Sequence, residues 1–410
     1  MRGSRLALIA AAAALAVLPQ AAQAQRAAGL RPDSTSLEGG IWGSADKAEA
    51  AARTKADVNH DPALNAYVRG VTCKVAADHC PDLRVYVLDR PAFNALVAPN
   101  GYVEVWSGLM LRSTDEAEFA YVLGHEFSHF AQNHTLVAYN AAKSRANVAL
   151  AAKVAIAVVG VAAASGATTA SEAQSIMDAT GNLIDVVYLA EIAAFFRFSR
   201  EQEAEADLLG QKRAAIAGYD ARSAAQSWRS VMAETQASDF KRVRESRSRT
   251  SVFESHPLEA ERIAALDKQA PSLPASSDRG RERYRAAIRP HLSAWLRDDL
   301  RRRDFGQTLH LIDRLAAGGE DLGVLNYYRG EAYRLRRGDG DLGRARDAYL
   351  AAAAQPDTPL AAWRELGDIR KRDGDAAGAR AAYETYLAKA PQAEDAWLVQ
   401  DSLTSLDKGS

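Results

Sequence analysis

The sequence predicts a mostly helical α+β protein, in which a domain with a small sheet precedes an all-α domain of helical repeats. Two short runs, 83–89 and 102–106, alternate or stay apolar as strands do. Helical periodicity precedes these runs and resumes after them. Beyond about residue 284 the pattern is wholly helical, and parts of it recur. Of the 410 residues, 48% are hydrophobic, which suffices for the cores of two or three domains.

The amino-terminal residues 1–24 have the design of a secretory signal peptide. Arg2 and Arg5 precede the apolar run LALIAAAAALAVL, and the small residues AAQA follow it. We expect cleavage after Ala24 and export to the periplasm. An uncleaved anchor helix is the alternative, although the apolar run is shorter than the ~20 residues that a span needs.

The two cysteines, Cys73 and Cys80, predict a disulfide, because an even number of cysteines in an exported chain is typical of one. A pair of buried free thiols is the alternative. The net charge of -1 gives no indication of a nucleic-acid partner.

The elements before residue 113 are expected in the following order. Residues 25–56 are rich in Ala, Gly and Ser and are expected to be loosely ordered. A helical pattern covers 57–77. The turn signal APNG then separates FNALV from YVEVW, so a small sheet is expected.

The stretch YVLGHEFSHFAQNH, residues 121–134, suggests a metal site. His125 and His129 are four residues apart and therefore share one helix face, one turn apart. Two imidazoles so placed can reach one metal ion. Glu126 lies near enough to act on a metal-bound water without being a ligand.

The ends of this helix are also predicted. Ser113 and Glu116 have the spacing of a capping box, which would start the helix there. His134 falls outside the geometry of the other two histidines and is expected at the surface near the helix end.

The Ala- and Val-rich tract 147–166 is interpreted as part of a packed helical hairpin rather than a membrane span, because Lys153 interrupts it. Contact of this tract with lipid, as a peripheral membrane contact, stays open. The Pro- and Ser-rich segment 269–278 is the strongest boundary signal. We therefore expect one domain over 57–268, a linker over 269–283 and helical repeats over 284–410.

The carboxy-terminal part contains the offsets of the 34-residue tetratricopeptide repeat. Because helix pairs must stack to bury their faces, two clear copies are expected to lean on the preceding domain. The repeat positions are Trp363, Leu366, Gly367, Ala379, Tyr383 and Pro391, with a looser copy at Tyr327, Gly330, Ala345, Tyr349 and Pro356.

Two histidines do not complete a zinc site, and the acidic stretch 198–210 offers a third ligand. Glu203 and Asp207 share a helix face, one turn apart. If Glu203 binds the metal, Asp207 can accept a hydrogen bond from the far nitrogen of a ligand histidine. The alternative is an acidic helix face that is simply solvated.

Three ordered motifs, HEFSH, EAEAD and SHPLEAERI at 255–263, resemble the gluzincin peptidases related to the CAAX prenyl protease and the heat-shock membrane protease. The signal peptide and the repeat tail are similar to the soluble periplasmic branch of that family. The resemblance implies a zincin-like domain with one Zn²⁺ per chain, His125, His129 and Glu203 as ligands and Glu126 as general base.

The resemblance also implies catalytic roles for His256 and Arg262 as stabilisers of the oxyanion. His256 has a second interpretation, in which it occupies the open position on zinc and restrains the enzyme. A helix start without chemistry is the remaining alternative. The stretch 95–109 resembles the family's edge strand, which pairs with an extended peptide. A buried central strand is the alternative there.

The function expected from these residues is an exported zinc endopeptidase that hydrolyses unfolded or misassembled envelope proteins. The repeats would recruit a substrate or a partner, such as the outer-membrane assembly machinery. The rival hypothesis is a chaperone or scaffold for outer-membrane protein assembly, with a latent or vestigial protease site.

Overall fold

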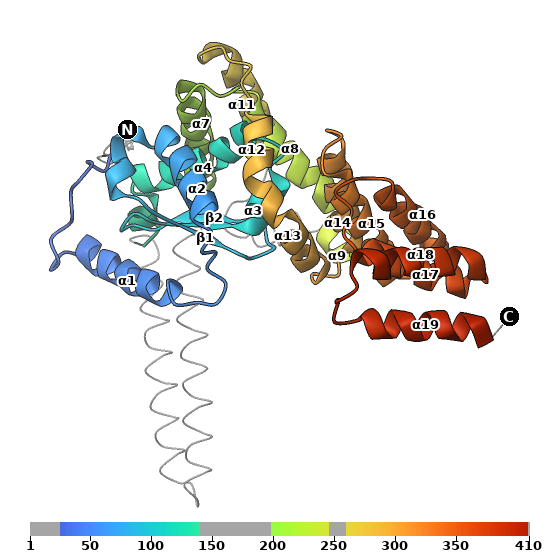
Figure 1. Cartoon of the computed structure of the whole chain (residues 1–410). Helices are drawn as coiled ribbons and strands as arrows, with labels where there is room; N and C mark the ends of the chain where they lie inside the picture. Colours follow the sequence, from blue (N-terminus) through green and yellow to red (C-terminus); the bar gives the residue numbers. More distant parts are fainter. Residues whose placement is uncertain (1–24, 140–197, 246–259, 409–410) are drawn as a thin grey trace, which may run out of the picture.

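The computed structural model describes residues 25–139, 198–245 and 260–408 (Figure 1). The predicted signal peptide at 1–24, the tract 147–166 and His256 lie outside the described residues. Among the helices of the described ranges, none combines the length and the apolar character that a membrane crossing requires.

A small three-stranded sheet precedes the motif helix, as predicted. It consists of β1 (Arg84–Leu88), β2 (Ala95–Val97) and β3 (Tyr102–Trp106) in the order β1-β3-β2. β1 pairs with β3 in parallel, and β2 pairs with β3 antiparallel. The APNG turn closes through the N–H of Gly101, which donates to the carbonyl of Ala98 at 2.9 Å, with φ of 82° at the glycine. Among the described strands, β3 is thus the central one and β2 lies at an edge.

The motif helix α4 (Glu116–Ala131) is the centre of the first domain, since all sixteen of its residues are buried. Its neighbours are α2 (Pro62–Val75), α7 (Arg200–Ile216), α8 (Ser223–Gln236) and the strand β2. Burial on every side explains why the helix carries small and apolar residues between its polar groups.

The start of α4 differs from the prediction by two residues. Ser113 ends the preceding helix α3 (Ser107–Arg112), and Asp115 caps α4 by accepting a hydrogen bond from the N–H of Glu118 at 2.9 Å. The carboxylate of Glu118 in turn accepts from the N–H of Thr114 at 2.9 Å. The prediction of a Ser113 cap was therefore wrong. Asp115 and Glu118 have the same three-residue spacing two positions later, and they cap the helix instead.

The segment 25–56, expected to be loosely ordered, contains helix α1 (Leu37–Ala52). Ala45 and Ala52 pack against Ala98 and Tyr102 at the sheet. The carboxylate of Glu49 accepts two hydrogen bonds from Arg84 on β1, at 2.6 and 2.8 Å. A helix held by two alanines and an ion pair leaves almost no apolar periodicity in the sequence.

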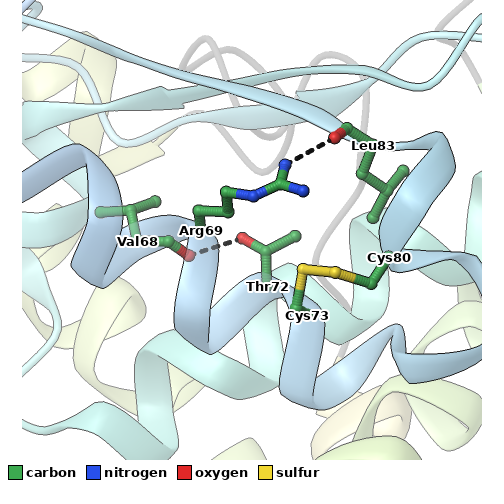
Figure 2. The surroundings of a disulfide bond; sticks show 6 residues. All are labelled: Val68, Arg69, Thr72, Cys73, Cys80 and Leu83. Atoms are coloured by element: carbon green, nitrogen blue, oxygen red, sulfur yellow. Dashed lines mark hydrogen bonds between the residues drawn. A yellow bond between two sulfur atoms is a disulfide. The ribbon is translucent and has the colours of Figure 1, made fainter.

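The predicted disulfide joins Cys73 and Cys80, with their Cα atoms 4.9 Å apart (Figure 2). It ties the end of α2 to the 3₁₀ turn η1 (Ala77–Asp82). Within that turn His79 is buried, and its ring packs against Phe127 and Phe130 of α4 at centroid distances of 5.4 and 5.8 Å. The disulfide therefore stabilises a loop that covers the motif helix.

The rest of the described chain is helical. Figure 1 shows the last helices stacked beside the first domain. The helices are α9 (Lys241–Glu245), α11 (Ala260–Gln269), α12 (Arg281–Ile288), α13 (Leu292–Leu300), α14 (Phe305–Ala316), α15 (Leu322–Arg336), α16 (Asp341–Ala353), α17 (Ala361–Arg372), α18 (Ala376–Lys389) and α19 (Ala396–Lys408), with short 3₁₀ turns η2 (Ala270–Ser272) and η3 (Arg289–His291).

One hydrophobic core runs across the Pro- and Ser-rich segment. Tyr284, Trp295 and Leu311 belong to the same buried cluster as Val103 and Phe119. Helices α12 to α15 therefore complete the core of the sheet-containing part. The predicted linker over 269–283 stays a prediction. The buried apolar cluster contains residues from both sides of it.

The last helices pack as pairs, α15 with α16 and α17 with α18. Each pair has the same close contact of a glycine with a tyrosine ring. A Cβ atom on Gly330 would lie 2.4 Å from the Tyr349 ring, and one on Gly367 would lie 2.4 Å from the Tyr383 ring. The repeated contact explains why both pairs require glycine at this position.

Candidate metal centre

The site forms where α4 and α7 approach each other at two glycines. A Cβ on Gly210 would lie 2.6 Å from the backbone nitrogen of His125, and one on Gly124 would lie 2.9 Å from the carbonyl oxygen of Gly210. Such close backbone contact requires glycine. Ser199 and Gln202 form a capping box that starts α7 just before its acidic residues. The packing of the two helices therefore fixes the acidic turn of α7 against the histidines of α4.

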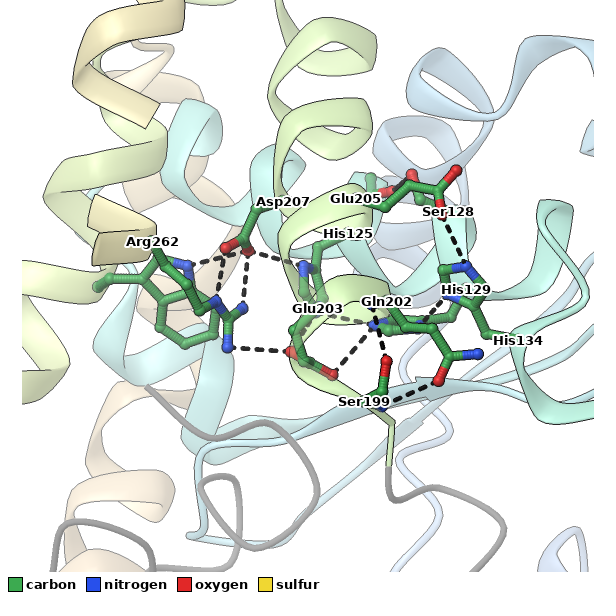
Figure 3. A network of polar contacts seen from close by, with 12 residues as sticks. His125, Ser128, His129, His134, Ser199, Gln202, Glu203, Glu205, Asp207 and Arg262 are labelled. Carbon is green, nitrogen blue, oxygen red and sulfur yellow. Dashed lines mark hydrogen bonds and ion pairs between the residues drawn. The ribbon is translucent and has the colours of Figure 1, made fainter. Parts of the chain in front are cut away.

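Three predicted ligands converge at this contact (Figure 3). The Nε2 atoms of His125 and His129 lie 3.2 Å apart. The carboxylate oxygens of Glu203 lie 3.6 Å from the first of these nitrogens and 3.5 Å from the second. One ligand atom from each residue lies within 4.8 Å of the others, and all three side chains are buried.

This donor set fits zinc. Two imidazole nitrogens and a carboxylate are the ligands of a catalytic zinc site that keeps a further position open. Two imidazoles and a carboxylate whose coordinating atoms face one another in a buried space are stabilised by a shared cation. The three residues present therefore suit the metal that the motif predicts.

Asp207 lies beside His125, and its orienting role stays a prediction. Its Oδ1 lies 3.0 Å from Nδ1 of His125 and accepts a hydrogen bond from the Tyr121 hydroxyl at 2.7 Å. Arg262 donates to both carboxylate oxygens of Asp207, at 2.6 and 2.8 Å, and its third nitrogen lies 3.0 Å from Glu203. Figure 3 shows this chain of contacts from Arg262 through the acids to the histidines.

The charges in this network stabilise one another. Burial alone would raise the pKa of Asp207, but hydrogen bonds from Arg262 and His125 hold the pKa of that carboxyl well below its usual value. Burial likewise opposes the charge of Arg262, and Asp207 and Glu203 keep the pKa of its guanidinium above the usual value. Asp207 is therefore a permanent anion behind His125.

His134 is not at the surface, and this expectation was wrong. It is 3% exposed, and its Nδ1 lies 2.9 Å from Nδ1 of His129. Its Nε2 lies 3.3 Å from the carboxylate of Glu205. Burial lowers the pKa of His134, which the carboxylate of Glu205 opposes only in part. The physical reason is the turn after α4, where Asn133 has a φ of 53° and directs the chain back.

The remaining predicted residues are placed as follows. Glu126 is buried on α4 between the two ligand histidines. Arg262 lies on α11 and is 6% exposed, and the contacts just described direct its guanidinium to Glu203 and Asp207. His256 lies outside the described residues, so its two interpretations stay predictions.

Two contacts of the site have no signal in the sequence. The ring of Phe198 stacks on the ring of His129, with centroids 3.8 Å apart and planes 16° apart. Trp228 on α8 donates to the Tyr121 hydroxyl at 2.6 Å. Both aromatic residues look like ordinary core residues in the sequence. The histidine at position 134, five residues beyond His129, is the one clue that was present and misinterpreted.

Comparisons with known proteins agree with this geometry. Residues 60–270 match the model of Peptidase family M48. The chain is 25% identical to a beta-barrel assembly-enhancing protease of Vibrio cholerae over 225 residues, which cover 54% of this chain and 42% of that protein. It is 42% identical to the mitochondrial metalloendopeptidase OMA1 of Bos taurus over 50 residues, 12% of this chain and 10% of that protein. Human OMA1 is 38% identical over 50 residues, with the same coverage.

The aligned parts span less than half the length of these relatives. The family match, in contrast, covers more than half of this chain. It includes α4 with its two histidines, the acidic turn of α7 and the helix of Arg262. On the match and the converging ligand set, the chain belongs to peptidase family M48.

Proposed function

We propose that the protein is an exported zinc-dependent endopeptidase that cleaves unfolded or misassembled envelope proteins. The convergence of His125, His129 and Glu203 in one buried cluster carries this proposal. The M48 match and the relatives, which are a protease and two metalloendopeptidases by name, support it.

The residues of the site divide the work of peptide hydrolysis. His125, His129 and Glu203 would hold zinc, which would supply Lewis-acid chemistry to the peptide carbonyl and to water. Glu126 accepts the proton of the attacking water and passes it to the leaving amine. Asp207 keeps the ring of His125 in one tautomer by accepting its Nδ1 proton.

Stabilisation of the oxyanion is predicted to involve His256 and Arg262. The contacts of Arg262 with Glu203 and Asp207 support a further role for this residue, in which it orients both carboxylates. In the orienting role, the guanidinium contacts the two carboxylates. In the oxyanion role, it must face the substrate.

Extended peptides are the proposed substrates. β2 is an edge strand that lies against α4, and β3 is its partner among the described strands. An edge strand can bind a peptide through main-chain hydrogen bonds, which requires an unfolded segment and little sequence preference. The signal peptide predicted from the sequence and the name of the Vibrio cholerae relative support envelope proteins as the source of such segments.

The helices α15 to α18 are the proposed recruiting part. Their paired packing and the repeated glycine–tyrosine contact support two tetratricopeptide-type repeats. By stacking, such repeats present an extended surface to a protein partner. Components of outer-membrane assembly are the proposed partners.

A scaffold or chaperone with a latent protease site is the second candidate. The exposed side chains of Trp397 and Leu398 on α19 favour it, at 64% and 48% exposed. Neighbouring large apolar side chains that together form an exposed patch are typical of sites that bind other proteins.

Cleavage of an unfolded protein separates the two candidates. The purified protein should degrade casein, and Glu126→Gln should slow this about 10²–10⁴-fold through loss of the general base. Zinc content and the unfolding transition of the variant serve as controls and should match the wild type. Equal rates for the two proteins, or no cleavage by either with zinc bound, would favour the scaffold.

A further inference from the structure

Buried His134 connects the second predicted zinc ligand, His129, to the exposed carboxylate of Glu205, which the sequence did not predict. We propose that His134 and Glu205 are positioning residues, which hold His129 in the tautomer and orientation required for metal binding. The proposal rests on the zinc site of the proposed function and adds two residues to it.

The geometry places both ring nitrogens of His134 between polar groups. Nδ1 of His134 lies 2.9 Å from Nδ1 of His129, and Nε2 of His134 lies 3.3 Å from Oε2 of Glu205. The His134 side chain is 4% exposed, whereas that of Glu205 is 51% exposed. The connection therefore runs from the buried metal cluster to the solvent, and Figure 3 shows its three members side by side.

The hydrogen positions in this connection follow from the metal site. Nε2 of His129 faces His125 and Glu203, so a metal bound there leaves the proton of neutral His129 on Nδ1. That N–H can donate to His134 only if Nδ1 of His134 acts as the acceptor. His134 then carries its own proton on Nε2 and donates it to Glu205. Each donor thus has an acceptor, and one tautomer of His129 is selected.

In this arrangement, Nδ1 of each ligand histidine is linked to a carboxylate of α7. Nδ1 of His125 contacts Asp207 directly at 3.0 Å, and Nδ1 of His129 reaches Glu205 through His134. Both carboxylates come from α7, the helix that also supplies Glu203. One helix therefore provides a ligand and the acceptors that orient the other two ligands.

Shape alone does not explain His134. The His129 ring already packs against Phe198, at 3.8 Å between centroids. An apolar residue at position 134 would fill the same space, but it would leave Nδ1 of His129 without this acceptor. The hydrogen-bonding role and a packing role therefore predict different effects of substitution.

Zinc affinity of the full chain tests the proposal. Zinc is removed, and its dissociation constant is measured by competition with a chromophoric chelator. We expect His134→Ala to weaken zinc binding about 10–100-fold. His134→Gln should restore most of it, because the amide oxygen can accept from His129 while the amide nitrogen donates to Glu205.

A double-mutant cycle tests Glu205. Glu205→Ala removes the acceptor for the Nε2 proton of His134, so it should weaken zinc binding in the wild-type background and have no further effect beside His134→Ala, since the two residues act in series. Glu201→Ala is the matched control, as an exposed acid on the same helix, and should bind zinc as the wild type does. The free energy of unfolding of each zinc-free variant reports any purely structural effect.

The outcomes are distinct. If His134→Ala lowers the stability of the zinc-free protein but binds zinc as tightly as the wild type, His134 acts by packing alone and the proposal is overturned. Additive effects of the His134 and Glu205 changes would also overturn it. A wild-type protein with no affinity for zinc would instead contradict the zinc endopeptidase itself.

Discussion

Arg112 shows how single residues join distant parts of the chain. From α3, its guanidinium donates to Glu234 of α8 at 2.8 Å and to Asp299 of α13 at 2.6 Å, and all three side chains are buried. Asp299 also accepts from the hydroxyl of Thr308 at 2.7 Å. Burial would raise the pKa of Asp299, but the charge of Arg112 holds the pKa of this carboxyl below its usual value.

The depressed pKa of Asp299 predicts a dependence of stability on pH. Its ionised form is favoured by folding, so this contribution is full above the unfolded pKa of about 3.9 and is lost as the pH falls below it. Asp299→Asn should cost about 3–5 kcal/mol at pH 7, because it leaves the buried Arg112 short of a charge partner. The difference from the wild type should shrink below about pH 4.

Urea unfolding of both proteins at pH 7 and at pH 3.5 measures this effect. A difference that is small at neutral pH, or that grows on acidification, would contradict the assigned charge of Asp299.

Residues of the site were predictable where a helix fixes their spacing. His125 and His129 lie one turn apart, as do Glu203 and Asp207, so periodicity alone placed each pair on one face. His134 was missed because its position depends on the left-handed backbone at Asn133. A single φ angle of this kind leaves no periodic pattern in a sequence.

At the scale of elements, the site depends on how closely α4 and α7 approach. Gly124 and Gly210 permit the backbone contact, and His125 lies at that contact. Loss of either glycine would separate the histidines from Glu203. The sequence contains both glycines but gives no indication that they face each other.

Gly210→Ala should therefore weaken both the fold and the metal site. Its Cβ would lie 2.6 Å from the backbone nitrogen of His125 and must displace one helix. We expect a loss of about 1–3 kcal/mol in the free energy of unfolding, together with weaker zinc binding. Gly70→Ala in α2 is the matched control, because a Cβ there would meet no atom within 4 Å.

Chemical denaturation and chelator competition on both variants check this prediction. If Gly210→Ala and Gly70→Ala behave alike, the close contact does not position the site.

Elements were predictable to the extent that they bury one periodic face. The helix around α2, the strands β1 and β3 and the motif helix were all expected within a few residues of their observed bounds. Helix α1 was not predicted, because it packs on the sheet through two small residues, Ala45 and Ala52, and through the ion pair of Glu49 with Arg84. These contacts produce no apolar periodicity. The start of α4 was misplaced because Ser113 and Asp115 are both good caps.

At the scale of the whole molecule, the core extends beyond the boundary that composition predicts. Pro and Ser residues at 269–278 indicate a linker, yet Tyr284 and Trp295 are buried in the same cluster as Val103 of the sheet. A linker signal reports local backbone preference only. Which side chains fill a core depends on tertiary packing, which no local pattern encodes.

Two truncations test where the core ends. A chain ended after residue 279 loses α12 to α15, and with them a large share of the core cluster, and it should not unfold cooperatively. A chain ended after residue 355 keeps α15 with its partner α16 and should fold and bind zinc. Circular dichroism with thermal unfolding distinguishes the two chains, and a stable chain ending at 279 would restore the boundary at the linker.

The zinc content of the whole protein tests the central claim most directly. Elemental analysis of the purified, chelator-free protein should give about one zinc per chain, since one set of three candidate ligands is present in the described residues. His125→Ala and Glu203→Ala should each reduce this to near zero, whereas the exposed Glu201→Gln should retain it. A freshly purified wild-type protein without zinc, or one that keeps its zinc in both ligand variants, would contradict the account.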